Sequence, residues 1–274
     1  MPAQQDLAHV FHALHHDAQN ILVLPNAWDA GSALLMQSLK PAAIATSSAA
    51  VAWALGFGDG DQLPVDKLLA CIEGITRRLQ LPLTVDIEGG YADDPQTVGE
   101  TVAAVIGAGA VGINIEDGRS APELLARKIA AARRAAERAG VRLFINARTD
   151  VYLKGLVPPE QRVAECLSRA ALYREAGADG LFAAGARAPA EIAALVAGTP
   201  LPVNILALAG VPAAAELQAL GVRRVSSGSG IAESVYARIA ELSREFLRSG
   251  DGAGLSAQAL SYGELNGMMT GSTD

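Results

Sequence analysis

Short apolar runs alternate with helix-like segments along the chain, and this alternation constrains the fold more than any other feature. Segments rich in Ala, Leu, Glu and Arg, such as 122–140 and 160–177, have helical spacing between the runs. Strands that alternate with helices form mainly parallel sheets. The apolar runs predict eight strands, at residues 21–29, 42–48, 81–88, 110–117, 142–150, 179–185, 201–208 and 222–230.

Glycine punctuates this pattern. Gly109, Gly140, Gly177 and Gly221 each lie directly before Ala or Val at the start of an apolar run, as expected for glycines that end helices. There is no linker and no break in composition, so we predict a single domain over 1–274. Its predicted fold is an α/β (β/α)8 TIM barrel with an N-terminal helix and a C-terminal helical tail.

An open, doubly wound sheet is the alternative fold. That architecture commonly carries a glycine fingerprint after its first strand, and "LPNAWDAGSALL" (24–35) does not supply one. The tail at 255–269 reads as one or two short helices that could pack on a neighbouring subunit.

Composition restricts the class of protein. The 274 residues carry a net charge of −7 and lack the basic clusters of a nucleic-acid surface. The most apolar window, 193–215, contains three prolines and so predicts no membrane span. We expect Cys71 and Cys166 to be buried free thiols. The N-terminal stretch does not resemble a leader, and we expect a cytoplasmic protein.

Polar side chains collect at the predicted ends of the strands, where barrel enzymes place their chemistry. Asp86 and Glu88 end one run, two residues apart, so on a strand both carboxylates would share a face. Such a pair needs a cation or a shared proton, unless it is solvated at the rim or paired with Arg148. The next run ends in Glu116. Oxygen ligands of this kind suit Mg2+ or Mn2+.

The histidines and cysteines narrow the chemistry further. All four histidines precede the first strand, and no strand end carries a histidine or a cysteine. We therefore exclude a Ser-His-Asp or Cys-His mechanism and a zinc hydrolase. An amphipathic helix that covers the barrel is the simplest interpretation of His9, His12, His15 and His16.

Other strand-end residues have ordinary structural interpretations. We expect Asp117 to cap the next helix, and Asp29 and Asp150 to be cap or turn residues. The "TSS" segment at 46–48 and the "SSGSG" segment at 226–230 could cap helices or receive a carboxylate or phosphate.

Six motifs in a fixed order resemble the isocitrate lyase/phosphoenolpyruvate mutase superfamily, across about residues 10–265. The resemblance implies a (β/α)8 barrel, often with the last helix exchanged between subunits of a dimer or tetramer. It also implies a Mg2+ site that binds a small 2-oxo or 2-hydroxy carboxylate. The motifs are "LPNAWDAGSA" (24–33), "TSSAAVAWALGFGDGD" (46–61), "VDIEGGY" (85–91), "GINIEDG" (112–118), "NARTD" (146–150) and "VRRVSSGSG" (222–230).

The resemblance also implies roles for single residues. Asp86 matches the acid that touches the metal, while Glu88, Glu116 and Asp59 match acids that hold it mostly through water. Glu88 stands where Asp is more usual. Arg148 matches the arginine that binds the substrate anion, and it is a catalytic candidate together with Glu116. The substrate-binding candidates are Trp28, Thr46, Ser47, Ser48, Arg148 and Asn204.

One segment departs from the superfamily pattern. The lyases carry a loop after strand four whose cysteine is the catalytic acid/base, whereas this chain runs "IEDGRSAPELLARKI" (115–129) without a cysteine. We therefore expect a Mg2+-dependent carbon–carbon lyase or decarboxylase that uses an oxaloacetate-like acid. The alternatives are C–P chemistry, as in a phosphoenolpyruvate mutase or phosphonopyruvate hydrolase, and a barrel that binds metal and carboxylate without turnover.

Overall fold

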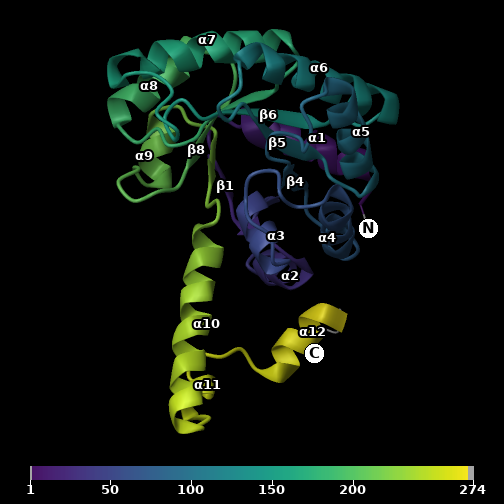
Figure 1. Ribbon diagram of the computed structural model, residues 1–274, viewed down its shortest axis with the longest axis vertical. Helices are drawn as coiled ribbons and strands as arrows, with labels where there is room; N and C mark the ends of the chain where they lie inside the picture. Colours follow the sequence, from purple (N-terminus) through teal and green to yellow (C-terminus); the bar gives the residue numbers. More distant parts are fainter. Residues whose placement is uncertain (1, 271–274) are drawn as a thin grey trace.

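A computed structural model describes residues 2–270, and within them nine parallel strands form a nearly closed ring surrounded by helices (Figure 1). The strand order around the ring is β1-β9-β8-β7-β6-β5-β4-β3-β2. The predicted barrel fold is confirmed. The strands are β1 Leu22–Leu24, β2 Asn26–Ala27, β3 Ile44–Thr46, β4 Leu83–Asp86, β5 Gly112–Glu116, β6 Phe144–Thr149, β7 Gly180–Ala183, β8 Val203–Leu206 and β9 Arg224–Ser226.

The first predicted strand is divided in two, which explains nine strands instead of eight. Pro25 separates β1 from β2; it has no N–H for a strand ladder, although its carbonyl accepts from Ala45 N at 3.1 Å. β1 pairs with β9 and β2 pairs with β3. The apolar run at residues 21–29 thus contacts both the last strand, β9, and the next strand along the chain, β3.

Helices cover the outside of the ring (Figure 1). Gly140 ends α6 with a φ of 67°, in the left-handed region that favours glycine. The helices are α1 Gln4–His16, α2 Ala30–Ser38, α3 Ser48–Ala54, α4 Val65–Thr76, α5 Pro95–Gly107, α6 Pro122–Ala139, α7 Arg162–Glu175, α8 Pro189–Gly198, α9 Ala214–Ala219, α10 Gly230–Ser249, α11 Ala253–Ser256 and α12 Tyr262–Thr270, and a 3-10 turn, Pro159–Gln161, precedes α7.

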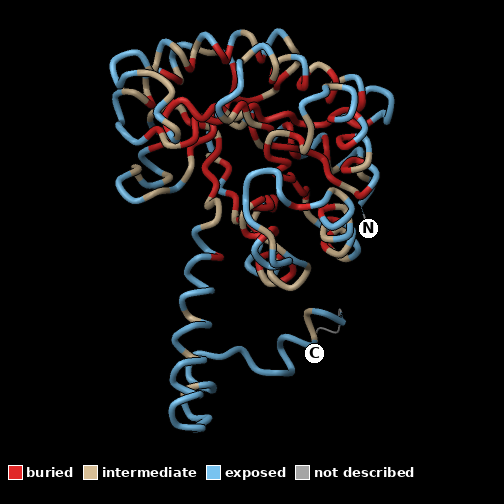
Figure 2. Tube along the Cα trace, viewed as in Figure 1, coloured by how far each residue is buried: buried red, intermediate tan, exposed pale blue. Residues whose placement is uncertain are grey.

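The strands are buried along nearly their whole length, as Figure 2 shows by colour. Apolar positions such as Val85, Ile113 and Ile145 are fully buried in the core. Both faces of a barrel strand are covered, by helices outside and by other strands inside. The polar side chains at the strand ends are therefore held on a rigid base.

Helix α1 (Gln4–His16) packs against the start of β6. His15 stacks on Phe144 with ring centroids 3.7 Å apart, and Phe11 meets the same ring edge-on. A Cβ at Gly112 would lie 2.6 Å from the Phe11 ring, so only glycine fits at the start of β5. This helix covers the N-terminal end of the barrel, opposite the end that carries the acids.

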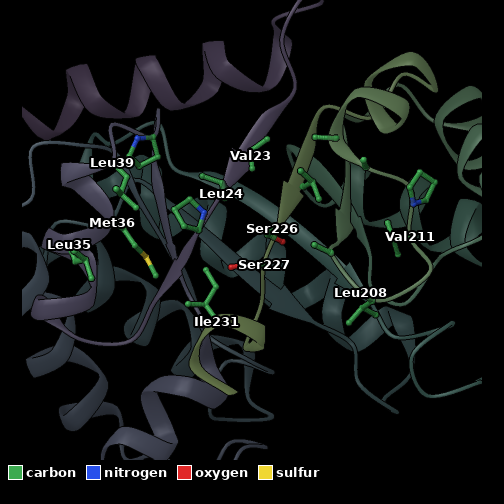
Figure 3. Close-up of a pocket in the computed structure, with 17 residues that line it drawn as sticks. Val23, Leu24, Leu35, Met36, Leu39, Leu208, Val211, Ser226, Ser227 and Ile231 are labelled. Atoms are coloured by element: carbon green, nitrogen blue, oxygen red, sulfur yellow. The ribbon is translucent and has the colours of Figure 1, made fainter. Parts of the chain in front are cut away.

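Helix α10 extends away from the barrel, and only Ala232 among its residues is buried (Figures 1 and 2). Next to its first turn lies an apolar groove of about 800 Å³ between α2 and the segment after β8. Figure 3 shows Met36 and Leu39 on one side of this groove, Leu208 and Val211 on the other, and Ile231 at its base.

Two sequence expectations concern burial and membranes. Cys166 is buried and Cys71 is half-buried, and both are free thiols. Burial raises the pKa of Cys71 to about 11 and that of Cys166 to about 12. Between residues 2 and 270, no helix is both long enough and apolar enough to cross a bilayer.

The first prediction concerns His15, whose Nδ1 donates to Phe11 O at 2.7 Å while the buried Nε2 has no partner. Burial lowers the pKa of His15 well below its usual value, so below about pH 6.5 the unfolded chain binds a proton that the folded chain does not. His15 therefore lowers the free energy of unfolding as the pH decreases through this range, by at most about 1.4 kcal/mol per pH unit.

We expect His15→Leu to weaken the loss of unfolding free energy between pH 7 and 5, measured in urea. The control is His16→Leu, on the exposed side of the same helix. Equal pH slopes in the wild type and the His15 variant would show that this imidazole is not the cause.

Candidate active site

Asp86 ends β4 and is almost completely buried. Its N–H donates to Thr46 Oγ1 at 3.0 Å, and its carboxylate accepts from Glu88 N at 3.0 Å and from Asn114 Nδ2 at 3.4 Å. Burial raises the pKa of Asp86, while the charge of Arg148 acts in the opposite direction. Within the described residues Asp86 forms no salt bridge, so a buried carboxylate lacks a direct counter-charge.

Glu88 lies beyond the end of β4, with a φ of 51° in the left-handed region. The expectation that it shares a strand face with Asp86 is therefore wrong. Its carboxylate instead accepts from the backbone N–H groups of Gly60 (2.7 Å) and Asp61, and from Tyr91 Oη at 3.3 Å. Burial is the main cause that raises the pKa of Glu88 to about 7.

These contacts fasten the segment after α3 over the end of β4. The segment includes Asp59, which is exposed and whose charge raises the pKa values of both Asp86 and Glu88. Asp61 Oδ1 accepts from Tyr91 N at 3.1 Å. The structure thus brings the charge of Asp59 close to the two strand-end acids.

Arg148 lies between two carboxylates. Its position on β6 is in register with Glu116 on β5, and Nη1 lies 2.6 Å from Glu116 Oε2. On the other side, Nε lies 2.7 Å from Asp150 Oδ1. We expect Asp150 to be a cap or turn residue, and it begins the turn that follows β6, where its carbonyl accepts from Lys154 N at 2.8 Å; its carboxylate also binds this guanidinium.

Burial and charge oppose each other at this pair. Burial raises the pKa of Glu116 to about 8, although Arg148 lowers it. Burial would lower the pKa of Arg148, but Glu116 and Asp150 outweigh it and hold that pKa above its usual value. The guanidinium therefore stays charged and is fixed from two sides.

The "TSS" segment lies beside Asp86. Ser47 is the N-cap of α3, and its Oγ accepts from Ala50 N at 3.4 Å. Thr46 and Ser48 are buried. Trp28 is half-buried, and its N–H donates to Ser32 Oγ at 3.0 Å.

Asn204 is part of a polar layer inside the ring. Its side chain accepts from Asn146 Nδ2 at 3.2 Å and donates to Ser226 Oγ at 3.2 Å. Arg224 joins this layer by donating to Asn114 Oδ1 at 3.1 Å, and its Nε and Nη1 have no hydrogen-bond partner among residues 2–270. Burial lowers the pKa of Arg224 to about 9. The layer connects the barrel interior to Asp86 through Asn114.

Two expectations about helix caps have different outcomes. Asp29 caps α2 in a reciprocal arrangement with Ser32, as predicted. Asp117 does not cap α6, whose N-cap is Ala121 without a side-chain bond. Its buried carboxylate instead accepts from Arg169 Nη1 (2.8 Å), Tyr173 Oη (2.7 Å) and the Asp150 backbone N–H (2.9 Å).

A cavity of about 220 Å³ opens beside Glu88 and Glu116, and Lys128 and Lys154 contribute to its walls. Lys128 Nζ donates to Gly89 O at 2.8 Å. Lys154 Nζ lies 2.9 Å from Asp150 Oδ2 and 3.8 Å from Glu116 Oε1. Neither lysine was a candidate from the sequence; the one local signal is that Lys154 follows Asp150 by four residues.

The carboxylate oxygens of this site are the type of ligand that a divalent cation prefers. Buried carboxylates with raised pKa values repel one another, and a cation would relieve this repulsion. Among the described residues, no three His, Cys, Asp or Glu side chains lie close enough to hold one ion together. The protein could therefore provide only part of the ligand shell directly.

A (β/α)8 barrel with buried acids and a fixed arginine at its strand ends is the architecture of an enzyme that acts on a small anion. The sequence profile of the phosphoenolpyruvate phosphomutase family matches residues 11–247. The chain belongs to this family, which lies within the isocitrate lyase/phosphoenolpyruvate mutase superfamily of lyases and mutases.

Individual relatives agree with this assignment. An uncharacterized protein of Mycobacterium tuberculosis (strain ATCC 25618 / H37Rv) is 39% identical over 80% of this chain and 81% of its own. A Burkholderia cenocepacia J2315 structure, assigned provisionally as a phosphonomutase, is 44% identical with a TM-score of 0.83, covering 87% of this chain and 99% of its own.

Two further relatives have named activities. An oxaloacetate decarboxylase of Rhodopseudomonas palustris (strain TIE-1) is 31% identical over 55% of this chain and 54% of its own. A phosphonopyruvate hydrolase solved with oxalate and Mg2+ is 23% identical, with a TM-score of 0.84 over 97% of this chain and 95% of its own. The latter likeness shows the fold alone.

The second prediction concerns Asp117. Asp117→Leu would leave the buried Arg169 paired with Glu165 alone and would remove the acceptor of Tyr173 Oη. Breaking a buried ion pair by removing one partner typically costs about 3–5 kcal/mol. We expect a corresponding loss of unfolding free energy in denaturant titrations. The control Glu241→Leu removes an exposed partner of Arg238 and should cost less than about 1 kcal/mol. Similar losses in both variants would contradict the interpretation.

Proposed function

We propose that this protein is a Mg2+-dependent carbon–carbon lyase that decarboxylates a small 2-oxo dicarboxylate similar to oxaloacetate. The observation that carries the proposal is the group of acids formed by the buried Asp86 and Glu88 and the half-buried Glu116, next to a fixed Arg148. Such an arrangement suits an anionic substrate that arrives with a divalent cation. A scaffold without turnover would have little use for these clustered like charges.

Asp86 is the best candidate for direct contact with the cation, because it is buried and has no salt bridge among the described residues. Glu88, Glu116 and Asp59 would hold the ion mainly through water. When bound, Mg2+ or Mn2+ would supply a Lewis acid for the negative charge that develops during bond cleavage.

Arg148 would bind the substrate anion and stabilise the enolate charge. Glu116 and Asp150 hold the guanidinium in place before substrate arrives, so little reorganisation is needed during the reaction. Ser47 and Ser48 would receive the substrate carboxylate, with Trp28 and Thr46 beside them. The C3–C4 bond then breaks, CO2 leaves, and its electron pair remains on the substrate as an enolate.

The short connection between β5 and α6, residues 117–121, favours decarboxylation over cleavage of isocitrate-like acids. It contains no cysteine that could act as an acid. Decarboxylation tolerates this absence because CO2 leaves without a proton and water can protonate the enolate. The named activity of the Rhodopseudomonas palustris relative is consistent with this choice.

The third prediction is that the protein releases pyruvate from oxaloacetate well above the rate with Mg2+ alone. Activity should disappear with EDTA and fall by at least about 100-fold in Glu116→Gln, which removes one of the two charges that fix Arg148. Coupled lactate dehydrogenase measures the pyruvate. A wild-type rate equal to the metal-only background would reject decarboxylation.

The fourth prediction separates the metal site from the fold. Asp86→Asn should abolish metal-dependent turnover with little change in melting temperature, because strand-end residues of barrels serve catalysis more than stability. Arg148→Ala should weaken substrate binding and turnover together. Full activity in either variant, under the same assay, would contradict the site assignment.

C–P chemistry is the second candidate, and the similarity to the Burkholderia cenocepacia structure favours it. Phosphonopyruvate would present the same 2-oxo carboxylate to the site. Release of inorganic phosphate from phosphonopyruvate, without turnover of oxaloacetate, would support C–P bond cleavage as the function. Thermal stabilisation by Mg2+ and oxalate without turnover of either acid would instead indicate a binding protein.

We also propose that α10 is exchanged between two copies of this chain. Ile231, Val235, Ile239, Leu242 and Phe246 are spaced four, four, three and four residues apart, so they form one apolar stripe. Most of this stripe is exposed. The groove beside β1 and α2 lies where the helix after the last strand would complete the ring, and the partner's α10 would fill it.

The fifth prediction tests this exchange. Ile239→Asp places a charge in the stripe and should convert a dimer, or a multiple of it, to monomers in light scattering. Val10→Asp, the same kind of change at an exposed position on α1, should leave the oligomer intact. A monomeric wild type would disprove helix exchange.

A further inference from the structure

We propose that Lys154 donates the proton that the enolate carbon takes up after CO2 has left. This inference rests on the proposed decarboxylation and names a residue that the superfamily resemblance does not supply. The structural basis is the position of Lys154 Nζ at the cavity beside Glu116, against the connection that lacks the cysteine.

The position of Lys154 is fixed by the acids that also hold Arg148. Its Nζ lies 2.9 Å from Asp150 Oδ2 and 3.8 Å from Glu116 Oε1. Arg148 binds the other oxygen of Glu116 and both oxygens of Asp150. The Lys154 ammonium and the Arg148 guanidinium therefore bind the same two carboxylates. A substrate held by Arg148 would lie within reach of the lysine.

The connection after β5 makes room for this lysine. Gly118 has a φ of 56°, and a Cβ built on it would lie 3.3 Å from Lys154 Nζ. A longer loop or a larger side chain at this place would compete with the ammonium for space. The short connection after β5 and Lys154 thus line the same part of the cavity.

Arg119 and Lys128 are the other cationic groups on the cavity, and both are poorer donors. Arg119 is a guanidinium, which does not give up its proton in proteins. Lys128 is buried, and its Nζ is committed to Gly89 O. Lys154, with 34% of its side chain exposed, can also regain a proton from solvent.

The proposed step balances. Loss of CO2 leaves an electron pair shared by the enolate oxygen and C3. That pair forms a new C3–H bond with a proton from Lys154 Nζ, while the N–H bonding pair stays on nitrogen. The product is the 2-oxo acid, and the neutral amine then takes a proton from water. No oxidant or further reactant is required.

The test is the stereochemistry of protonation. Decarboxylation of 3-methyloxaloacetate in D2O with Mg2+ creates [3-2H]2-oxobutanoate, which lactate dehydrogenase and NADH trap at once as 2-hydroxybutanoate. Proton NMR then gives the configuration at C3. A donor fixed on one side of the enolate gives one configuration, whereas protonation in free solution gives both equally.

We expect one configuration from the wild type and an equal mixture from Lys154→Met, with CO2 release still measurable. Lys154→Arg keeps the positive charge for the ion pairs but cannot donate a proton to carbon, so it should also give the mixture. If the Met variant misfolds, the Arg variant alone provides the test. Arg119→Met, at an exposed position on the same cavity, should keep one configuration.

A second measurement uses oxaloacetate itself. In Lys154→Met the enol should leave the enzyme, so CO2 should appear before pyruvate becomes detectable. A single configuration from both Lys154 variants, or an equal mixture from the wild type, would overturn the assignment of this donor. No CO2 from the wild type with either acid would overturn the proposed function itself, and the inference with it.

Discussion

Arg148 is held between Glu116 and Asp150, and the open end of the barrel is organised around this guanidinium. Buried like charges are unstable unless cations or hydrogen bonds compensate them. Here Arg148 compensates two acids, Lys154 touches both of them, and backbone N–H groups compensate Glu88. Asp86 accepts hydrogen bonds from Glu88 N and Asn114 but has no salt-bridge partner within residues 2–270, which explains why a divalent cation suits the site.

This charge balance depends on strand register. Arg148 lies directly opposite Glu116, and Asp86 lies opposite Asn114, so the groups that interact are neighbours in the sheet. The same ladder continues around the ring to β1 and β2, which lie on either side of Pro25 and pair with β9 and β3. The catalytic proposal and the fold are therefore linked through the same hydrogen-bonded ladder.

Most of the fold could be predicted from the sequence, because apolar runs and helix-ending glycines are local signals. The division of the first run was missed although Pro25, which has no N–H for a strand ladder, lies within it. The strand-end acids and Arg148 could also be found, since strand ends mark the catalytic end of a barrel. Their spacing alone could not show that Glu88 turns away from the strand into a left-handed conformation.

The residues that sequence reasoning missed depend on contacts distant along the chain. Asp117 resembles a helix cap until α7 brings Arg169 and Tyr173 to it. Lys154 lies in an ordinary turn, and it becomes a candidate only because it lies near Glu116, 38 positions earlier in the printed sequence. Arg224 reads as a surface residue next to Arg223, yet it is buried inside the ring. Local patterns carry no information on such partners.

The most direct test of the account is a Mn2+ titration followed by electron paramagnetic resonance, with and without oxalate. The account predicts one Mn2+ per chain, bound more tightly when oxalate is present, because the ligand completes a shell that the protein provides only in part. It also predicts competition by Mg2+. Absence of bound Mn2+ under both conditions would contradict the central claim that the buried acids form a divalent-cation site for a small 2-oxo acid.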